Sequence, residues 1–312
     1  MSYKVFFLGT PEIALASLDF LKKEKRIELL GVISQPDRPA GRGKRLKSPA
    51  TVTWAMENNI PTFQTENINK DFELIEKLEN ENPDFFIVFA FSQFLGKKIL
   101  DLPKIGAFNL HTSLLPKYRG AAPIQYALLN GDRETGVTLQ KMVKKMDAGD
   151  IVNTEKVEIA PDEKAFELHD KLAQISPKVL KNFINELEKG ELKTTPQNEL
   201  NVSFAPLIKK EMGHLKPENL SAKEAYNRLR ALKPWPGVYF FLADKRVKVL
   251  EAIISDEESK VDFKMIFQNN KLLLKMKEGT LELKKLQMEG KKPMEGSLFF
   301  HGYKDKLKSK IS

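Results

Sequence analysis

Short apolar segments alternate with amphipathic segments along the first part of the chain. Residues 4–8 and 28–34 are apolar, and between them, over residues 12–25, apolar side chains recur at the spacing of one helix face. The alternation continues with apolar segments at 85–91, 105–111 and 137–143 and with helical patterns at 71–80, 94–100 and 123–130. Continuous apolar strands are typical of parallel sheets that are covered on both faces. The pattern therefore predicts an α/β fold with an open, mostly parallel sheet.

The pattern changes in the second half of the chain. Residues 166–189 are amphipathic and predict a long helix, which we expect to be broken at Pro177 and to end at Gly190. Beyond a polar, proline-containing stretch we expect a helix at 222–231 and short strands at 238–242, 247–252, 272–276 and 281–286. Short strands at close spacing favour a small β-barrel or sandwich. The chain is thus predicted to divide into a domain at 1–190, a linker at 191–206 and a second domain at 207–312.

Positive charge is concentrated in the last third of the chain. The net charge is +9, yet residues 1–206 hold 28 basic and 28 acidic side chains, whereas residues 207–312 hold 23 basic and 14 acidic ones. A basic domain beside a neutral one favours a polyanionic partner such as nucleic acid, because neutralising phosphates releases counterions. A lysine-rich, solvated surface accounts for the composition equally well. Charge alone leaves both interpretations open.

The composition excludes several kinds of chemistry. Because the chain has no cysteine, it holds no disulfide, zinc thiolate site or thiol nucleophile. The four histidines, His111, His169, His214 and His301, lack the spacing of metal ligands, so we expect no metal. No apolar run approaches the roughly 18 residues needed to cross a bilayer, and the chain enters its first strand without a signal-peptide pattern. We expect a cytoplasmic protein that does not contact a membrane.

The most distinctive polar residues stand at the end of an apolar strand. Asn109 and His111 are two residues apart there, so they project from one face, roughly 7 Å from each other. An amide donor beside an imidazole suits a reaction in which a carbonyl oxygen becomes negative while an amine loses a proton. A purely structural pair is disfavoured, because burying such donors without partners costs about 1–3 kcal/mol each. Asp147, in a glycine-containing turn, could add a carboxylate, although a turn-forming role is an equal alternative.

A basic segment follows the second predicted strand. Over residues 35–47 it carries Arg38, Arg42, Lys44, Arg45 and Lys47 on a backbone with two glycines and two prolines. This composition predicts an irregular loop rather than a regular element. Such a loop can order on an RNA backbone, and a solvated surface loop is the alternative.

Together these motifs resemble those of the methionyl-tRNA formyltransferase family along nearly the whole chain. The shared motifs are the turn at 9–11, the basic loop at 35–43, Asn-Leu-His-Thr-Ser-Leu-Leu-Pro at 109–116, Arg-Gly-Ala-Ala-Pro-Ile at 119–124 and Asp-Ala-Gly-Asp at 147–150. The Asn-His-Asp set is common to folate-dependent formyl transferases and deformylases. The basic loop and the basic second domain narrow the acceptor to an aminoacylated tRNA. By this resemblance the first domain is a Rossmann-like formyltransferase fold and the second an oligonucleotide-binding-like (OB-like) barrel.

The resemblance also implies an activity and a set of site residues. The expected reaction moves the formyl group of 10-formyltetrahydrofolate to the amino group of initiator methionyl-tRNA, in a monomer without metal. Asn109, His111 and Asp147 are the expected catalytic residues. The expected folate-binding residues are Ser113, Leu114, Leu115 and Pro116, and the expected tRNA-binding residues are Arg42, Lys44, Arg45 and Lys47. The chain departs from the usual family pattern at Phe91, Ser92 and Thr112.

Two other functions are consistent with the sequence. A folate-dependent formyltransferase or hydrolase that acts on a small molecule would keep the Asn-His-Asp chemistry but would not need the basic loop. An RNA-binding module with a structural α/β half would bind RNA without binding folate. Folate titration and a comparison of charged tRNA with small amines separate these alternatives.

Overall fold

The protein forms two compact units in a computed structural model that describes residues 2–40, 43, 45–257 and 265–304. The first unit comprises Met1–Pro123, Glu134–Glu158 and His169–Phe204. The second comprises Ile124–Arg133, Ile159–Leu168 and Ala205–Ser312. Each unit therefore draws on more than one stretch of the sequence.

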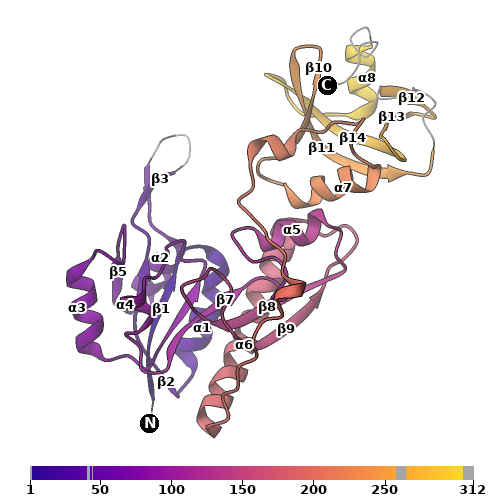
Figure 1. Ribbon diagram of the computed structural model, residues 1–312. Coiled ribbons are helices and arrows are strands. Elements are labelled where there is room, and N and C mark those ends of the chain that lie inside the picture. Colours follow the sequence, from indigo (N-terminus) through magenta and orange to yellow (C-terminus); the bar gives the residue numbers. More distant parts are fainter. Residues whose placement is uncertain (1, 41–42, 44, 258–264, 305–312) are drawn as a thin grey trace. The chain divides into compact units, whose positions relative to one another are not determined.

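The first unit is built on a seven-stranded sheet (Figure 1). Its strands, in spatial order, are β5 Thr62–Gln64, β2 Ile27–Ser34, β1 Tyr3–Gly9, β6 Phe85–Phe89, β7 Gly106–His111, β8 Glu134–Lys141 and β9 Ile151–Glu158. The strands from β5 to β7 are parallel, and β8 runs antiparallel to both of its neighbours. The predicted α/β class with a mostly parallel sheet is confirmed. From β1 the chain continues to β2 on one side, and from β6 it continues to β7 on the other side. Open α/β sheets bind ligands at the carboxyl ends of the two strands where the connections diverge in this way.

Helices cover both faces of this sheet. They are α1 Leu15–Lys23, which follows a short 3-10 turn at Glu12–Ala14, α2 Ala50–Glu57, α3 Phe72–Glu81, α4 Lys97–Leu100 and α6 Ala165–Lys189. On one face, Phe86 and Val88 of β6 belong to a buried cluster with Ile75 of α3. On the other face, Phe85 meets Phe183 of α6 at 5.2 Å between ring centroids. Alternate side chains of β6 thus enter two cores, which explains why every position of this strand is apolar.

Helix α6 runs without interruption through Pro177, so the predicted break there is wrong. Proline has no N–H to donate to the carbonyl four residues earlier, here that of Ala173. The Ser176 hydroxyl donates to that carbonyl oxygen at 2.8 Å and replaces the missing bond. Even this longest helix is too polar to cross a membrane, and no other helix in the described part of the chain qualifies.

The basic segment after β2 contains a regular hairpin, contrary to the irregular loop expected from its glycines and prolines. Strand β3, Arg38–Ala40, pairs antiparallel with β4, Arg45–Lys47. Pro39 lies opposite Leu46 in this two-stranded ribbon, where each strand keeps one edge free. A proline is tolerated on such an edge because no partner needs its N–H. Arg42 and Lys44 lie outside the described residues.

The second unit is an antiparallel sheet with helices, separate from the first fold as predicted. Its strands are β10 Val238–Leu242, β11 Lys245–Ser255, β12 Met265–Gln268, β13 Lys271–Lys275, β14 Thr280–Met288 and β15 Met294–Glu295, with the order β10-β11-β14-β13-β12 and β15 beside β14. The helices are α5 Pro123–Leu129, of which Pro123 belongs to the first unit, α7 Ala222–Ala231 and α8 Gly296–Tyr303. Two earlier stretches of the chain, 124–133 and 159–168, complete this unit.

Helix α7 is tied to these earlier stretches by polar contacts. The Asn227 side chain donates to the Leu129 carbonyl oxygen at 3.4 Å. The Tyr226 hydroxyl donates to the Asp162 carboxylate at 2.6 Å. Burial, together with this carboxylate, raises the pKa of Tyr226 to about 12. Loss of the Tyr226 hydroxyl proton at high pH would therefore break the contact between α7 and Asp162.

Candidate active site

The polar residues of the Asn-Leu-His motif lie at the carboxyl end of β7. His111 is 6% exposed, and Asn109, two residues earlier, is half-buried. On the neighbouring antiparallel strand β8, Gln140 lies opposite Asn109 and Thr138 lies opposite His111. Directly paired residues of adjacent strands project to the same face. The strand pairing thus brings two further polar side chains to the motif.

The His111 ring is held from both of its nitrogens. Nε2 lies 2.8 Å from the backbone carbonyl oxygen of Tyr118, which can only accept, so Nε2 carries a proton. Nδ1 lies 3.7 Å from Oδ1 of Asp147, beyond hydrogen-bond length. Nδ1 therefore faces the Asp147 carboxylate.

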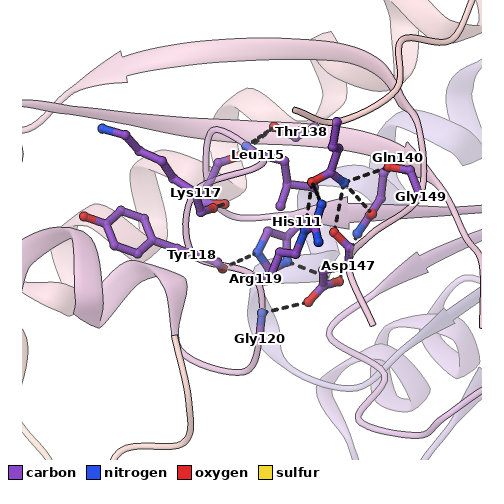
Figure 2. A network of polar contacts seen from close by, with 12 residues as sticks. His111, Leu115, Lys117, Tyr118, Arg119, Gly120, Thr138, Gln140, Asp147 and Gly149 are labelled. Atoms are coloured by element: carbon purple, nitrogen blue, oxygen red, sulfur yellow. Dashed lines mark hydrogen bonds and ion pairs between the residues drawn. The ribbon is translucent and has the colours of Figure 1, made fainter. Parts of the chain in front are cut away.

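The Asp147 carboxylate is fixed by two donors, as Figure 2 shows. Oδ2 accepts from the Gly120 backbone N–H at 2.9 Å, and Oδ1 accepts from the Gln140 side-chain amide at 2.9 Å. The side chain is 13% exposed, and the residue has a φ of 50°, in the left-handed region that Asp tolerates better than most residues. Asn109 and His111 are thus carried by β7, and Asp147 lies in a turn that is bonded to β8 through Gln140.

Gln197, in the stretch predicted as a linker, is hydrogen-bonded to the turn at Asp147. The Gln197 Nε2 donates to the backbone carbonyls of Asp147 at 2.9 Å and Gly149 at 2.7 Å. Its Oε1 accepts two hydrogen bonds from the Arg119 guanidinium, at 2.8 and 3.0 Å. Arg119 is only 2% exposed, so this buried cation depends on its partners.

Glu199 supplies the charge that balances Arg119. The Arg119 Nη2 donates to a Glu199 carboxylate oxygen at 2.8 Å. This hydrogen bond, assisted by the positive charges of Arg119 and Lys145, holds the pKa of Glu199 below its ordinary value. The same stretch is bonded to the turn after β7, since the Ser203 hydroxyl accepts from the Tyr118 backbone N–H at 2.9 Å.

The residues predicted to bind folate lie in the turn that follows His111. Ser113 is fully buried, and its hydroxyl donates to the Lys117 carbonyl at 2.6 Å, while Leu115 is also buried. Leu114 and Pro116 are partly exposed. The first pair therefore shapes the turn, and the second pair faces outward from the core.

Two of the four residues predicted to bind tRNA lie on strand β4 of the β3–β4 hairpin. Arg45 and Lys47 are exposed on β4, and the Lys47 ammonium lies 3.7 Å from the Glu12 carboxylate. The exposed Arg38 pairs with Glu66. The hairpin follows β2, and its described residues make none of the hydrogen bonds given above around Asp147.

No cluster of three or more potential metal ligands occurs in the described residues. The polar network described above consists of amides, one imidazole, carboxylates and one guanidinium. Groups of these kinds can bind a carbonyl oxygen and move a proton.

Two family models cover most of the chain. The model described as "Formyl transferase" matches residues 3–184, and the model described as "Formyl transferase, C-terminal domain" matches residues 207–304. A sugar 3N-formyl transferase solved in the presence of dTDP and 5-N-formyl-THF is similar in fold, with a TM-score of 0.68 at 21% identity over 94% of this chain and 100% of that one. An N-formyltransferase from Helicobacter canadensis has a TM-score of 0.67 at 20% identity over 91% of this chain and 99% of that one. The chain is therefore a member of the formyl transferases.

Curated relatives narrow the class. The methionyl-tRNA formyltransferase of Sulfurihydrogenibium sp. (strain YO3AOP1) is 38% identical over 97% of this chain and 98% of its own length. That of Clostridioides difficile (strain 630) is 39% identical over 93% of this chain and 94% of its own length. The chain belongs to the methionyl-tRNA formyltransferase family.

Proposed function

We propose that the protein transfers the formyl group of 10-formyltetrahydrofolate to the free amino group of initiator methionyl-tRNA, which yields N-formylmethionyl-tRNA for translation initiation. What supports the proposal is the approach of His111 Nδ1 to Asp147 Oδ1 at 3.7 Å, with Asn109 two residues before His111 on β7, in a chain that matches methionyl-tRNA formyltransferases over nearly its full length. Catalysis belongs to residues 1–190, which also carry the basic loop, and residues 207–312 form a further tRNA-binding domain, with the linker 191–206 between them.

The catalytic roles follow from the chemistry of the three side chains. When the amine attacks the formyl carbon, negative charge develops on the formyl oxygen, and the Asn109 amide donates to it. His111 stabilises the same oxygen as an imidazolium or as a positioned donor. Because Nε2 is bonded to the Tyr118 carbonyl oxygen, Nδ1 is the ring nitrogen that faces Asp147. Asp147 holds His111 and assists removal of the proton from the attacking amine. Collapse of the tetrahedral intermediate then breaks the bond between the formyl carbon and N10 of the folate, which leaves as tetrahydrofolate with a proton on N10.

Alanine variants test each role. A lost oxyanion donor typically removes about 3–4 kcal/mol of transition-state stabilisation, so Asn109→Ala, His111→Ala and Asp147→Ala should each lower kcat by orders of magnitude in a folded protein. His169→Ala is the matched control, because His169 is a partly exposed histidine of α6 that pairs with the neighbouring Asp170. Near-normal turnover in any one of the three variants refutes the role given to that residue.

The two substrates are given separate binding regions. Residues Ser113, Leu114, Leu115 and Pro116 form the folate-binding turn, in which Leu114 and Pro116 have the exposure that a ligand contact requires. Arg42, Lys44, Arg45 and Lys47 approach the acceptor stem of the tRNA, and the two of them that are described, Arg45 and Lys47, are exposed on β4, as contacts to a phosphate backbone require. Arg45→Ala should raise the KM for charged tRNA and leave the folate Kd unchanged. An equal rise in the KM for charged tRNA and in the folate Kd contradicts separate binding regions for the two substrates.

A small-molecule acceptor is the second candidate, since sugar formyl transferases share the fold. Such an enzyme would formylate amino sugars at least as fast as charged tRNA. Direct comparison of these acceptors decides between the two.

A further inference from the structure

The second unit holds a cavity at the β10–β11 hairpin that combines aromatic and cationic side chains. Its volume is about 370 Å³, and its lining includes Lys210, Glu211, Trp235, Tyr239, Arg246 and Lys248. A second cavity of about 270 Å³ shares Arg246 and Lys248 and continues along residues 287–290. The two cavities therefore adjoin across the same two cations, and we call them together the β10–β11 groove.

The floor of this groove is a layered stack. The Arg246 guanidinium carbon lies 3.9 Å from the centroid of the Tyr239 ring, a close cation–π contact. Tyr239 also stacks on His214, with 5.3 Å between centroids and 3° between planes. Phe241 meets both rings edge-on, at 5.7 and 5.4 Å. The Arg246 guanidinium therefore lies over a ring that is itself packed against two others.

Arg246 keeps hydrogen-bonding capacity that the protein does not use. Its buried Nε has no hydrogen-bond partner among the residues that the structure describes. A buried N–H without a partner is costly, and an arginine fork is suited to two oxygens of a phosphate. The geometry thus favours an anionic ligand with oxygens in a fork.

Trp235 offers the groove a flat apolar face. The side chain is 55% exposed although it is a large aromatic, and it stands between Pro234 and Pro236, which restrict the backbone. An exposed aromatic beside phosphate-binding cations is the arrangement by which proteins stack unpaired bases and grip the backbone. In such an arrangement the indole stacks on the base, and the arginine and lysine bind the adjacent phosphate.

We propose that the β10–β11 groove binds one unpaired nucleotide of the tRNA, with its base stacked on Trp235 and its phosphate on Arg246 and Lys248. The inference rests on the proposed function for the identity of the RNA. A base inside a duplex offers no free face, so the ligand is a nucleotide from a single-stranded part of the tRNA.

The chain offers a direct reporter for this contact. It contains two tryptophans, and the other, Trp54, is 8% exposed with its indole N–H bonded to Asp19 at 2.8 Å. In full-length Trp54→Phe protein, Trp235 is the only indole. Uncharged tRNA and a short single-stranded RNA should quench its fluorescence, and a duplex RNA of equal charge should quench it much less. Polyglutamate is the probe for an acidic-peptide site, and AMP is the probe for a free-nucleotide site.

Kinetics with variants complete the test. Loss of one base stack weakens binding by about tenfold or more, so Trp235→Ala should raise the KM for charged tRNA by that factor, with kcat and the folate Kd unchanged. Trp235→Phe should retain most of the affinity, and Phe72→Ala, an exposed aromatic on α3, should be neutral. Arg246→Gln should weaken binding similarly and reduce its salt dependence.

Several outcomes overturn the proposal. They are an unchanged KM in Trp235→Ala, an unresponsive Trp235 at saturating RNA, stronger quenching by duplex RNA, and equal or stronger quenching by polyglutamate or AMP. If RNA quenches Trp235 but no tRNA is formylated, the proposed function is refuted and nucleotide binding by the β10–β11 groove is supported. If formylation is normal in Trp235→Ala, the proposed function is supported and nucleotide binding by the groove is refuted.

Discussion

Replacing Gln197 by glutamate and by alanine should separate its hold on the catalytic turn from its hold on Arg119. The Gln197 Nε2 donates to the carbonyls of Asp147 and Gly149 at 2.9 and 2.7 Å, and its Oε1 accepts twice from Arg119. Glutamate keeps the acceptor and adds a charge for Arg119, but it turns a carboxylate oxygen toward two carbonyl oxygens. Alanine removes these four contacts, and the 3.5 Å bond from Nε2 to the Gln140 Oε1, without creating that repulsion.

The magnitudes rank the two variants in one order for stability and in the reverse order for turnover. Neutral hydrogen bonds contribute about 0.5–1.5 kcal/mol each and bonds to a charged group about 1.5–3 kcal/mol each. Gln197→Glu should therefore cost about 1–3 kcal/mol of unfolding free energy, and Gln197→Ala should cost more because the buried Arg119 loses two bonds. Repulsion in the glutamate variant displaces the Asp147 turn further, and a misplacement of about 1 Å can cost about a hundredfold in rate. The expected order is glutamine, glutamate, alanine for stability and glutamine, alanine, glutamate for kcat.

Urea unfolding and steady-state formyl transfer measure the two orders. Lys193→Ala, an exposed change in the same segment, is the matched control and should affect neither. The KM values should change little, because Gln197 reaches the substrates only through Asp147. If kcat follows stability, or if Gln197→Glu turns over normally, Gln197 does not position the catalytic turn.

Two further changes test the same structure elsewhere. In Gly149→Ala the new Cβ would lie 1.7 Å from the Lys141 carbonyl oxygen, so the turn must move and kcat should fall by about a hundredfold, whereas Gly302→Ala, with nothing within 4 Å, should be neutral in both kcat and thermal melting. Equal effects of the two glycine changes contradict the account. The Tyr226 pKa is raised from 10.0 to about 12, so its bond to Asp162 stabilises the fold fully below pH 10 and loses that effect as pH rises toward 12. Urea unfolding across this range should show a loss of stability that is smaller in Tyr226→Phe, and an unchanged slope would refute the assignment.

The hydrophobic pattern predicted elements best where burial decides the conformation. Strand β6 is apolar at every position because its alternate side chains enter two cores, and helix α7 follows its pattern closely. The pattern failed where a local polar contact compensates for a poor residue. Ser176 replaces the bond that Pro177 cannot make, and only the folded helix shows it. The β3–β4 hairpin was missed because a free strand edge removes the usual penalty on proline.

The candidate site was predictable in part. The spacing of Asn109 and His111 indicated a shared face, and the pairing of β7 with β8 adds Gln140, which alternation on β8 could have indicated. Gln197 carried no such signal. It lies in a polar stretch, and its partners at the Asp147 turn are 50 and 48 residues away, so only tertiary folding brings them together.

The most direct test of the central claim is the choice of formyl acceptor. With 10-formyltetrahydrofolate as donor, initiator methionyl-tRNA should be formylated with a kcat/KM orders of magnitude above those of methionine methyl ester and amino-sugar nucleotides, and His111→Ala should abolish the difference in kcat. Faster transfer to an amino sugar, or release of formate without any acceptor at a comparable rate, would contradict the account.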